Sequence, residues 1–254
     1  MHRTLCIVLF ALNPTVPSIV SFPCVSNQFP QSLIFFEWHF LNGFFRGSLL
    51  TQHPLFAKIY SLLGGCDRKA LSQQRTILAK EAYGRVLELG CGPGFNFPYY
   101  RKDQGISEVT ATDPDQSMVA YAAKAALGAE VRVVVETGAA EKVNYPDASF
   151  DCVVSTLVLC TVSSPAEALT EIRRVLKPGG KFLFLEHVAS QKKIWSVLQR
   201  VLDPVWCRLA GGCRLCRKTQ EAISAHGFRI EKCEAVGNVG IPLLPLIQGI
   251  ARNL

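Results

Sequence analysis

Three glycines at alternating positions, with an acid in front of them, have the most informative spacing in this sequence; they lie in residues 88–94, Glu-Leu-Gly-Cys-Gly-Pro-Gly. Glycine lets a ligand approach the backbone closely, and a dinucleotide fingerprint places its third glycine three residues after the second. Here Gly94 comes two residues after Gly92. We therefore predict a loop for S-adenosylmethionine, which carries no pyrophosphate, with an acid serving its cationic methionine end. The predicted cofactor contacts are Glu88, Gly90, Cys91, Gly92 and Gly94. A glycine-rich turn without a ligand is the alternative.

A second acid, Asp113, ends the β-rich run of residues 108–113 and comes 23 positions after Gly90. In an open parallel sheet the carboxyl ends of neighbouring strands converge, so an acid there can accept hydrogen bonds from both ribose hydroxyls of a bound adenosine. We predict Asp113 as this ribose ligand. The alternative is an N-cap for the helix that starts near Asp115.

The elements that would position these residues alternate between strands and helices, which predicts an α/β fold with a doubly wound, mainly parallel sheet. The predicted strands are residues 85–90, 108–113, 130–135, 150–156 and 181–187, and the predicted helices are residues 70–82, a segment after Phe95, 115–127 and 165–176. Residues 177–180, Lys-Pro-Gly-Gly, end the last helix, because proline does not continue a helix and glycine permits unusual backbone angles.

Composition places the chain among globular proteins with a sizeable core. Its 254 residues are 49% hydrophobic and 19% charged, which is enough for one α/β domain with appendages. Ten cysteines are scattered along the chain, which indicates a reduced compartment. Cys213 and Cys216 have the spacing of a redox or zinc pair, but no second such pair and no matching pair of histidines accompanies them. We therefore predict no metal site.

Residues 192–218 form a basic segment with seven lysines and arginines and one acid, Asp203. Apolar residues, Trp195 and Trp206 among them, recur there at about helical spacing. This combination predicts a helix at a membrane surface, near anionic lipid. Nucleic acid is the rival partner, and an ordinary amphipathic helix packed on the sheet is the plain alternative.

Residues 1–52 predict a hydrophobic N-terminal extension, a possible targeting or membrane segment, in front of a domain at residues 53–254. Residues 4–36 contain no charged side chain, and residues 5–12 resemble the apolar core of a signal or anchor. Four prolines interrupt this run and argue against a single regular membrane-spanning helix.

In this order, the motifs at residues 88–94, 149–154 and 174–180 resemble those of the class I S-adenosylmethionine-dependent methyltransferases. A more specific resemblance is to the methyltransferase-like 7 proteins, the thiol S-methyltransferases. It rests on residues 53–57, 156–160, 184–189, 201–206 and 212–213. The resemblance implies a seven-stranded sheet, an enzyme associated with the endoplasmic reticulum or lipid droplets, and methylation of small thiols. The cytoplasm or another organelle is the alternative location.

Five residues outside the glycine loop complete the predicted site. By the resemblance, Ala140 and Glu141 would lie near the adenine, and Thr156 and Leu157 at the edge of the cofactor. His187, at the carboxyl end of the fifth predicted strand, is the predicted catalytic base or acceptor contact, since a neighbouring base raises the ionised fraction of a thiol.

The predicted function is therefore transfer of a methyl group from S-adenosylmethionine to a small molecule, with a thiol as the predicted acceptor. A C-methyltransferase of a quinone or sterol would share the whole cofactor half. Arsenite methylation would need a soft-ion site, but the cysteines here do not match that family's thiol set. A non-catalytic membrane or RNA module would need neither the glycine loop nor Asp113. No nucleic-acid partner is predicted, because the sequence lacks the Asn/Asp-Pro-Pro-aromatic motif expected of an enzyme that methylates RNA.

Overall fold

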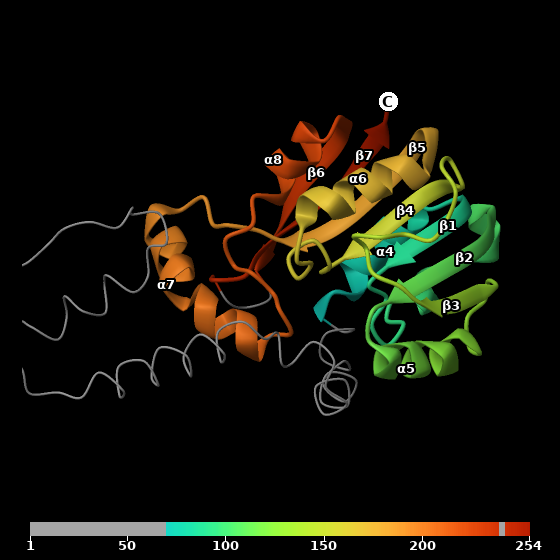
Figure 1. Cartoon of the computed structure of the whole chain (residues 1–254), viewed down its shortest axis with the longest axis horizontal. Coiled ribbons are helices and arrows are strands. Elements are labelled where there is room, and N and C mark those ends of the chain that lie inside the picture. Colours follow the sequence, from blue (N-terminus) through green and yellow to red (C-terminus); the bar gives the residue numbers. More distant parts are fainter. Residues whose placement is uncertain (1–69, 239–241) are drawn as a thin grey trace, which may run out of the picture. The chain divides into compact units, whose positions relative to one another are not determined.

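The computed structural model describes residues 70–238 and 242–254, and a seven-stranded sheet lies at their centre (Figure 1). The strands lie side by side in the order β3, β2, β1, β4, β5, β7 and β6. Their bounds are β1 Gly84–Leu89, β2 Ile106–Asp113, β3 Val133–Thr137, β4 Phe150–Thr156, β5 Leu176–His187, β6 Phe228–Asn238 and β7 Pro245–Asn253. The predicted extension, residues 1–52, and its boundary with the domain lie outside the described residues.

The sheet is parallel except at β7. β1 pairs in parallel with β2 and with β4, and the same direction continues to β3 and β5. β7 runs antiparallel to both β5 and β6. The strand order reverses between β1 and β4, and open α/β sheets bind ligands beyond the carboxyl ends of the strands at such a reversal. The predicted doubly wound, mainly parallel sheet of seven strands is confirmed.

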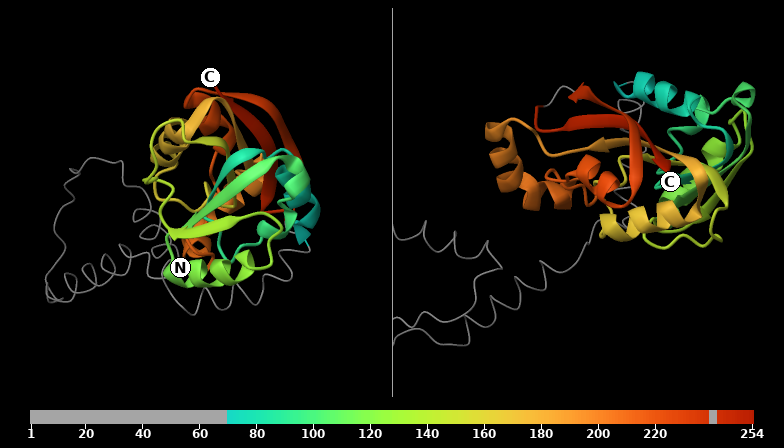
Figure 2. Two further views of the ribbon diagram at one scale, coloured as in Figure 1. Left: turned by 90° about the vertical axis from the view of Figure 1, so that its right-hand side faces the viewer. Right: turned by 90° about the horizontal axis from the view of Figure 1, so that it is seen from above.

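Helices cover both faces of this sheet. α4 (Ser72–Lys80) and α5 (Gln116–Ala126) contribute to one apolar core, while α6 (Pro165–Val175) and α8 (Thr219–Ala225) contribute to the other. The right-hand view of Figure 2 shows α4 and α6 on opposite sides of the strands. α7 (Lys193–Leu209) follows β5 and lies beyond the sheet (Figure 1).

Local sequence explains the bounds of α6. Ser164 is the N-cap, and its side chain accepts a hydrogen bond from the backbone N–H of Glu167 at 3.3 Å. Pro165 occupies the first turn, where its missing N–H costs nothing. The helix ends at Val175, and residues 177–180, Lys-Pro-Gly-Gly, belong to the start of β5, where Gly179 has a φ of +76°. The predicted helix at residues 165–176 is confirmed to within one residue.

Three predicted elements are wrong in detail. The helix predicted after Phe95 is a single 3-10 turn, η1 (Phe97–Tyr99), and a second such turn, η2 (Lys102–Gln104), follows it. Tyr100 and Arg101, which lie between the two turns, have extended backbone angles, so the chain does not continue as one helix. The strand predicted at residues 130–135 begins only at Val133, where pairing with β2 starts. The strand predicted at residues 181–187 begins already at Leu176, which pairs with Phe150 of β4.

Candidate active site

The glycine loop turns sharply at the carboxyl end of β1. Gly90, Gly92 and Gly94 have φ angles of +56°, +52° and +83°, a region that other residues rarely adopt. A Cβ on Gly90 would lie 2.6 Å from a methyl group of Val158, and one on Gly94 would lie 2.6 Å from the ring of Phe97. Glycine is therefore required at these positions by backbone angle, and at two of them also by space.

Asp113 joins the glycine loop to the end of β2. Its carboxylate accepts hydrogen bonds from the backbone N–H groups of Gly92 and Asp115, both at 2.9 Å, and burial raises its pKa. The N-cap of α5 is Asp115, whose side chain accepts from the N–H of Ser117 at 2.7 Å. The N-cap alternative for Asp113 is therefore wrong, because the neighbouring acid has that role. The ribose contact stays a prediction. Cys91, between the glycines, is buried.

Glu88 lies behind the glycine loop in a buried polar network. One carboxylate oxygen accepts from the hydroxyl of Tyr100 at 2.6 Å and the other from the amide of Asn96 at 3.1 Å. The same amide donates to the hydroxyl of Thr156 at 3.0 Å, so the network ties the glycine loop to the end of β4. Glu88 is 2% exposed. Its contact with the methionine end of a cofactor stays a prediction.

Sequence reasoning missed Asn96 and Tyr100. The sequence carried a signal for Asn96, which is a polar residue between Phe95 and Phe97. A polar side chain among buried aromatic residues is expected to form hydrogen bonds to buried partners. Arg75, on α4, donates to Asn96 at 2.6 Å and extends the network to a further helix.

The network predicts a pH-dependent stability. Burial raises the pKa of Glu88 from 4.5 to about 7, so the folded chain binds this proton more tightly than the unfolded chain does. The stabilisation is complete below pH 4.5 and is lost as the pH rises through 7, which amounts to about 3 kcal/mol of unfolding free energy. Urea unfolding at a series of pH values measures it.

Glu88→Gln provides the comparison for this prediction, because it keeps the shape of the side chain and removes the titration. The difference in unfolding free energy between wild type and variant should shift with pH across this window. A difference that stays constant from pH 4.5 to 7 would show that Glu88 does not carry the effect.

The loop after β4 is held by a buried acid. Glu186, near the end of β5 and 0% exposed, accepts hydrogen bonds from the hydroxyl of Ser155 at 2.6 Å and from the backbone N–H groups of residues 158–160 at 3.0 to 3.2 Å. Leu157 has φ +60°, a costly angle for a residue with a side chain, and its N–H donates to the carbonyl of Leu185. The predicted pair Thr156 and Leu157 thus lies in a fixed turn at the carboxyl edge of the sheet.

Ala140 and Glu141 follow β3 on the other side of Asp113. The N–H of Gly138, at the start of this loop, donates to the carbonyl of Asp113 at 3.1 Å. Glu141 accepts from the N–H of Ser163 at 2.8 Å, which joins the loop to the N-terminal end of α6. The loop lies beside the predicted ribose ligand, and its contact with an adenine stays a prediction.

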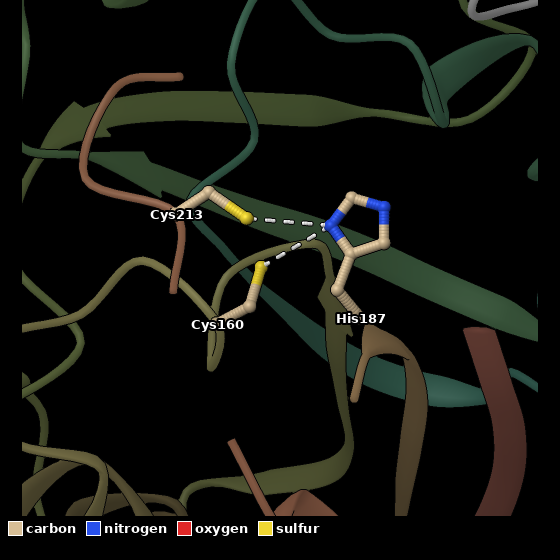
Figure 3. Close-up of side chains that lie close together, drawn as sticks. All are labelled: Cys160, His187 and Cys213. Atoms are coloured by element: carbon tan, nitrogen blue, oxygen red, sulfur yellow. Dashed lines mark hydrogen bonds between the residues drawn. The ribbon is translucent and has the colours of Figure 1, made fainter. Parts of the chain in front are cut away.

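His187 faces two cysteines. Its Nδ1 lies 3.4 Å from the Sγ of Cys213 and 3.9 Å from the Sγ of Cys160 (Figure 3). The hydrogen bond from the Cys160 thiol lowers the pKa of Cys213, and the same bond, together with burial, raises the pKa of Cys160. Cys216, which sequence spacing paired with Cys213, is not part of this cluster. The predicted base is therefore packed against thiols of the protein itself.

Comparison with known proteins adds information on the family. A model described as "Methyltransferase domain" matches residues 87–184. The chain is 37% identical to a thiol S-methyltransferase of Rattus norvegicus over 182 residues, 68% of this chain and 72% of that enzyme. It is 30% identical to a ubiquinone/menaquinone biosynthesis C-methyltransferase of Cupriavidus metallidurans over 178 residues, 65% of this chain and 72% of that enzyme. A crystal structure of an S-adenosylmethionine-dependent methyltransferase from Mesorhizobium loti superposes with a TM-score of 0.56 at 25% identity, covering 72% of this chain and 97% of that one.

Proposed function

Because the chain belongs to the thiol S-methyltransferase family, within the class I S-adenosylmethionine-dependent methyltransferases, we propose that it transfers the methyl group of S-adenosylmethionine to the sulfur of a small thiol. The observation that carries this proposal is the 37% identity to the rat thiol S-methyltransferase, against 30% to the quinone C-methyltransferase.

The carboxyl edge of the sheet suits this cofactor. Gly90 and Gly92 are half-buried and carry no side chain of their own, so a ligand could approach their backbone closely. Asp113 offers carboxylate oxygens to hydroxyl donors at the end of the neighbouring strand. The bound cofactor would supply a methyl group on a cationic sulfur. The chain's own task is to align the acceptor with that methyl group and to exclude water.

A methyl-transfer assay separates the two candidate acceptors. The purified full chain is incubated with S-adenosylmethionine labelled in its methyl group and either a simple alkyl thiol or a short-chain quinol. We expect label in the thioether product. Label in the quinol alone would replace the proposal with C-methylation, which the 30% identical relative favours as second candidate.

We also propose that the protein works at a membrane surface, at the endoplasmic reticulum or on lipid droplets. No helix in residues 70–238 and 242–254 is long and apolar enough to cross a bilayer. α7 supports surface binding in another way, because its apolar side chains recur every three or four positions and are 37% to 74% exposed. They are Ile194, Val197, Leu198, Val201, Leu202, Val205 and Leu209.

Polar contacts hold the helix to the described part of the domain. Its buried residue, Gln199, accepts from the N–H of Ser190 at 2.7 Å and donates to the carbonyl of Leu243 at 3.0 Å. Exposed basic residues, Lys193 and Arg200, accompany the apolar face and suit anionic lipid.

Replacing Ile194 and Val201 together by aspartate should weaken binding to vesicles containing phosphatidylserine by about tenfold or more, since it removes buried apolar area and adds repelled charge. The two side chains are 74% and 67% exposed, so the folded domain should lose little stability. Co-sedimentation with vesicles measures the effect.

Leu127→Asp serves as the matched control, because Leu127 is 89% exposed at the end of α5, on another helix. It should leave vesicle binding unchanged. Equal binding by the α7 double variant and the wild type would contradict the assignment of α7 to the membrane.

A further inference from the structure

We propose that Cys160, His187 and Cys213 form a binding site for a soft divalent metal ion, of which zinc is the commonest. Its fourth coordination position would be open to the thiolate of the methyl acceptor. The metal site stands on geometry alone. The role of its open position rests on the proposed function.

The three side chains come from segments far apart in the sequence and converge on one point. Cys160 lies in the loop after β4, His187 ends β5, and Cys213 lies in the loop after α7. Their ligand atoms all lie within 4.8 Å of one another. Figure 3 shows Nδ1 of His187 directed at both sulfur atoms.

The distances between these atoms suit a tetrahedral ion. With zinc–sulfur bonds of about 2.3 Å and zinc–nitrogen bonds of about 2.0 to 2.1 Å, a tetrahedral site separates sulfur from nitrogen by about 3.5 to 3.6 Å. The two observed separations, 3.4 Å and 3.9 Å, lie on either side of that value. These two separations would need to shift by only a few tenths of an ångström to hold an ion, and the two sulfur atoms lie within 4.8 Å of each other, against about 3.8 Å in a tetrahedral site.

Backbone hydrogen bonds hold the loops that carry the two cysteines. The N–H of Cys160 donates to Glu186 at 3.2 Å, and its carbonyl accepts from the N–H of Arg214 at 2.8 Å. The second bond ties the loop of Cys160 directly to that of Cys213. Cys160 and Cys213 are buried, and His187 is half-buried.

The three ligand types indicate which ions the site would bind and whether it would be structural or catalytic. Two thiolates and an imidazole favour zinc and other soft ions over magnesium or calcium, which prefer oxygen. Structural zinc sites have four protein ligands, whereas the three that converge within residues 70–238 and 242–254 leave a position for water or substrate, as in catalytic sites. In this arrangement His187 is a ligand and not the predicted base.

A thiol bound at the open position would lose its proton to solvent and become a thiolate. Its sulfur would then attack the methyl carbon of S-adenosylmethionine. The new sulfur–carbon bond forms as the methyl–sulfonium bond breaks, and the products are the methyl thioether and neutral S-adenosylhomocysteine. The cluster lies on the same carboxyl edge as the glycine loop, two strands away in the order β1, β4, β5, or about 10 Å at the usual strand spacing.

Zinc titration of the reduced full chain against a chromophoric chelator tests the site. Cys160→Ser, Cys213→Ser and His187→Gln should each lose one zinc equivalent or weaken its binding by at least about tenfold. Cys216→Ser and Cys233→Ser are matched controls on half-buried cysteines outside the cluster and should bind as the wild type does. Far-ultraviolet circular dichroism and binding of S-adenosylmethionine show that each variant is folded. Equal zinc binding by all five variants and the wild type would overturn the site.

Cobalt substitution tests the open position separately from catalysis. A simple alkyl thiol added without S-adenosylmethionine should change the visible spectrum of the cobalt-loaded chain, and the three ligand variants should not respond. An unchanged wild-type spectrum would overturn the open position. A spectral response combined with no methyl transfer to any thiol would overturn the proposed function and leave the metal site standing.

Discussion

Replacing Asp113 by alanine is expected to weaken the binding of S-adenosylmethionine by about 100-fold. Two losses add up in this variant. The ribose hydroxyls would lose hydrogen bonds to a charged acceptor, and the N–H of Gly92 would lose the carboxylate that holds the glycine loop against β2. Calorimetric titration of the cofactor into wild type and variant measures the loss.

Asp113→Asn and Asp103→Ala serve as comparisons. Asparagine keeps one acceptor oxygen and should give an intermediate affinity, while Asp103 lies exposed on η2 and its loss should change nothing. Wild-type affinity in a folded Asp113→Ala variant would remove Asp113 from the cofactor site. The predicted cofactor site would then lose its main contact outside the glycine loop.

The cofactor half of the site follows from sequence because its parts are local. A glycine loop comes directly after β1, and Asp113 ends β2, so strand ends and short turns are enough to place them. Parallel pairing then brings the two strand ends together, since Leu89 of β1 lies opposite Thr112 of β2. No information about distant contacts is needed for this step.

The cysteine and histidine cluster was missed for the opposite reason. Sequence spacing pairs Cys213 with Cys216. Nothing in it joins Cys213 to Cys160 or to His187, which was predicted only as a base or acceptor contact. The three ligands meet only because β4 and β5 are neighbours and the chain returns from α7 to their carboxyl ends. Arg214, whose N–H binds the carbonyl of Cys160, fixes that return, and its partner is a backbone atom that leaves no mark in the sequence.

Removal of the Glu186 side chain is expected to have the largest effect on folding. Glu186→Ala would leave three buried backbone N–H groups, those of residues 158–160, and the hydroxyl of Ser155 without their acceptor. An unsatisfied buried donor costs about 1 to 3 kcal/mol, so a total loss of about 4 kcal/mol or more is expected. Denaturant unfolding at constant pH measures it.

Glu186→Gln separates the hydrogen bonds from the charge. Oε1 accepts from Ser155, Val158 and Leu159, and Oε2 from Cys160. A glutamine that keeps its oxygen at the first position loses only the bond to Cys160 and places a donor there, so it should cost clearly less than alanine. Because that bond positions a proposed metal ligand, the glutamine variant should still weaken zinc binding. A loss below about 1 kcal/mol in Glu186→Ala, no larger than that of exposed Glu234→Ala, would mean that the turn after β4 keeps its shape without this acid.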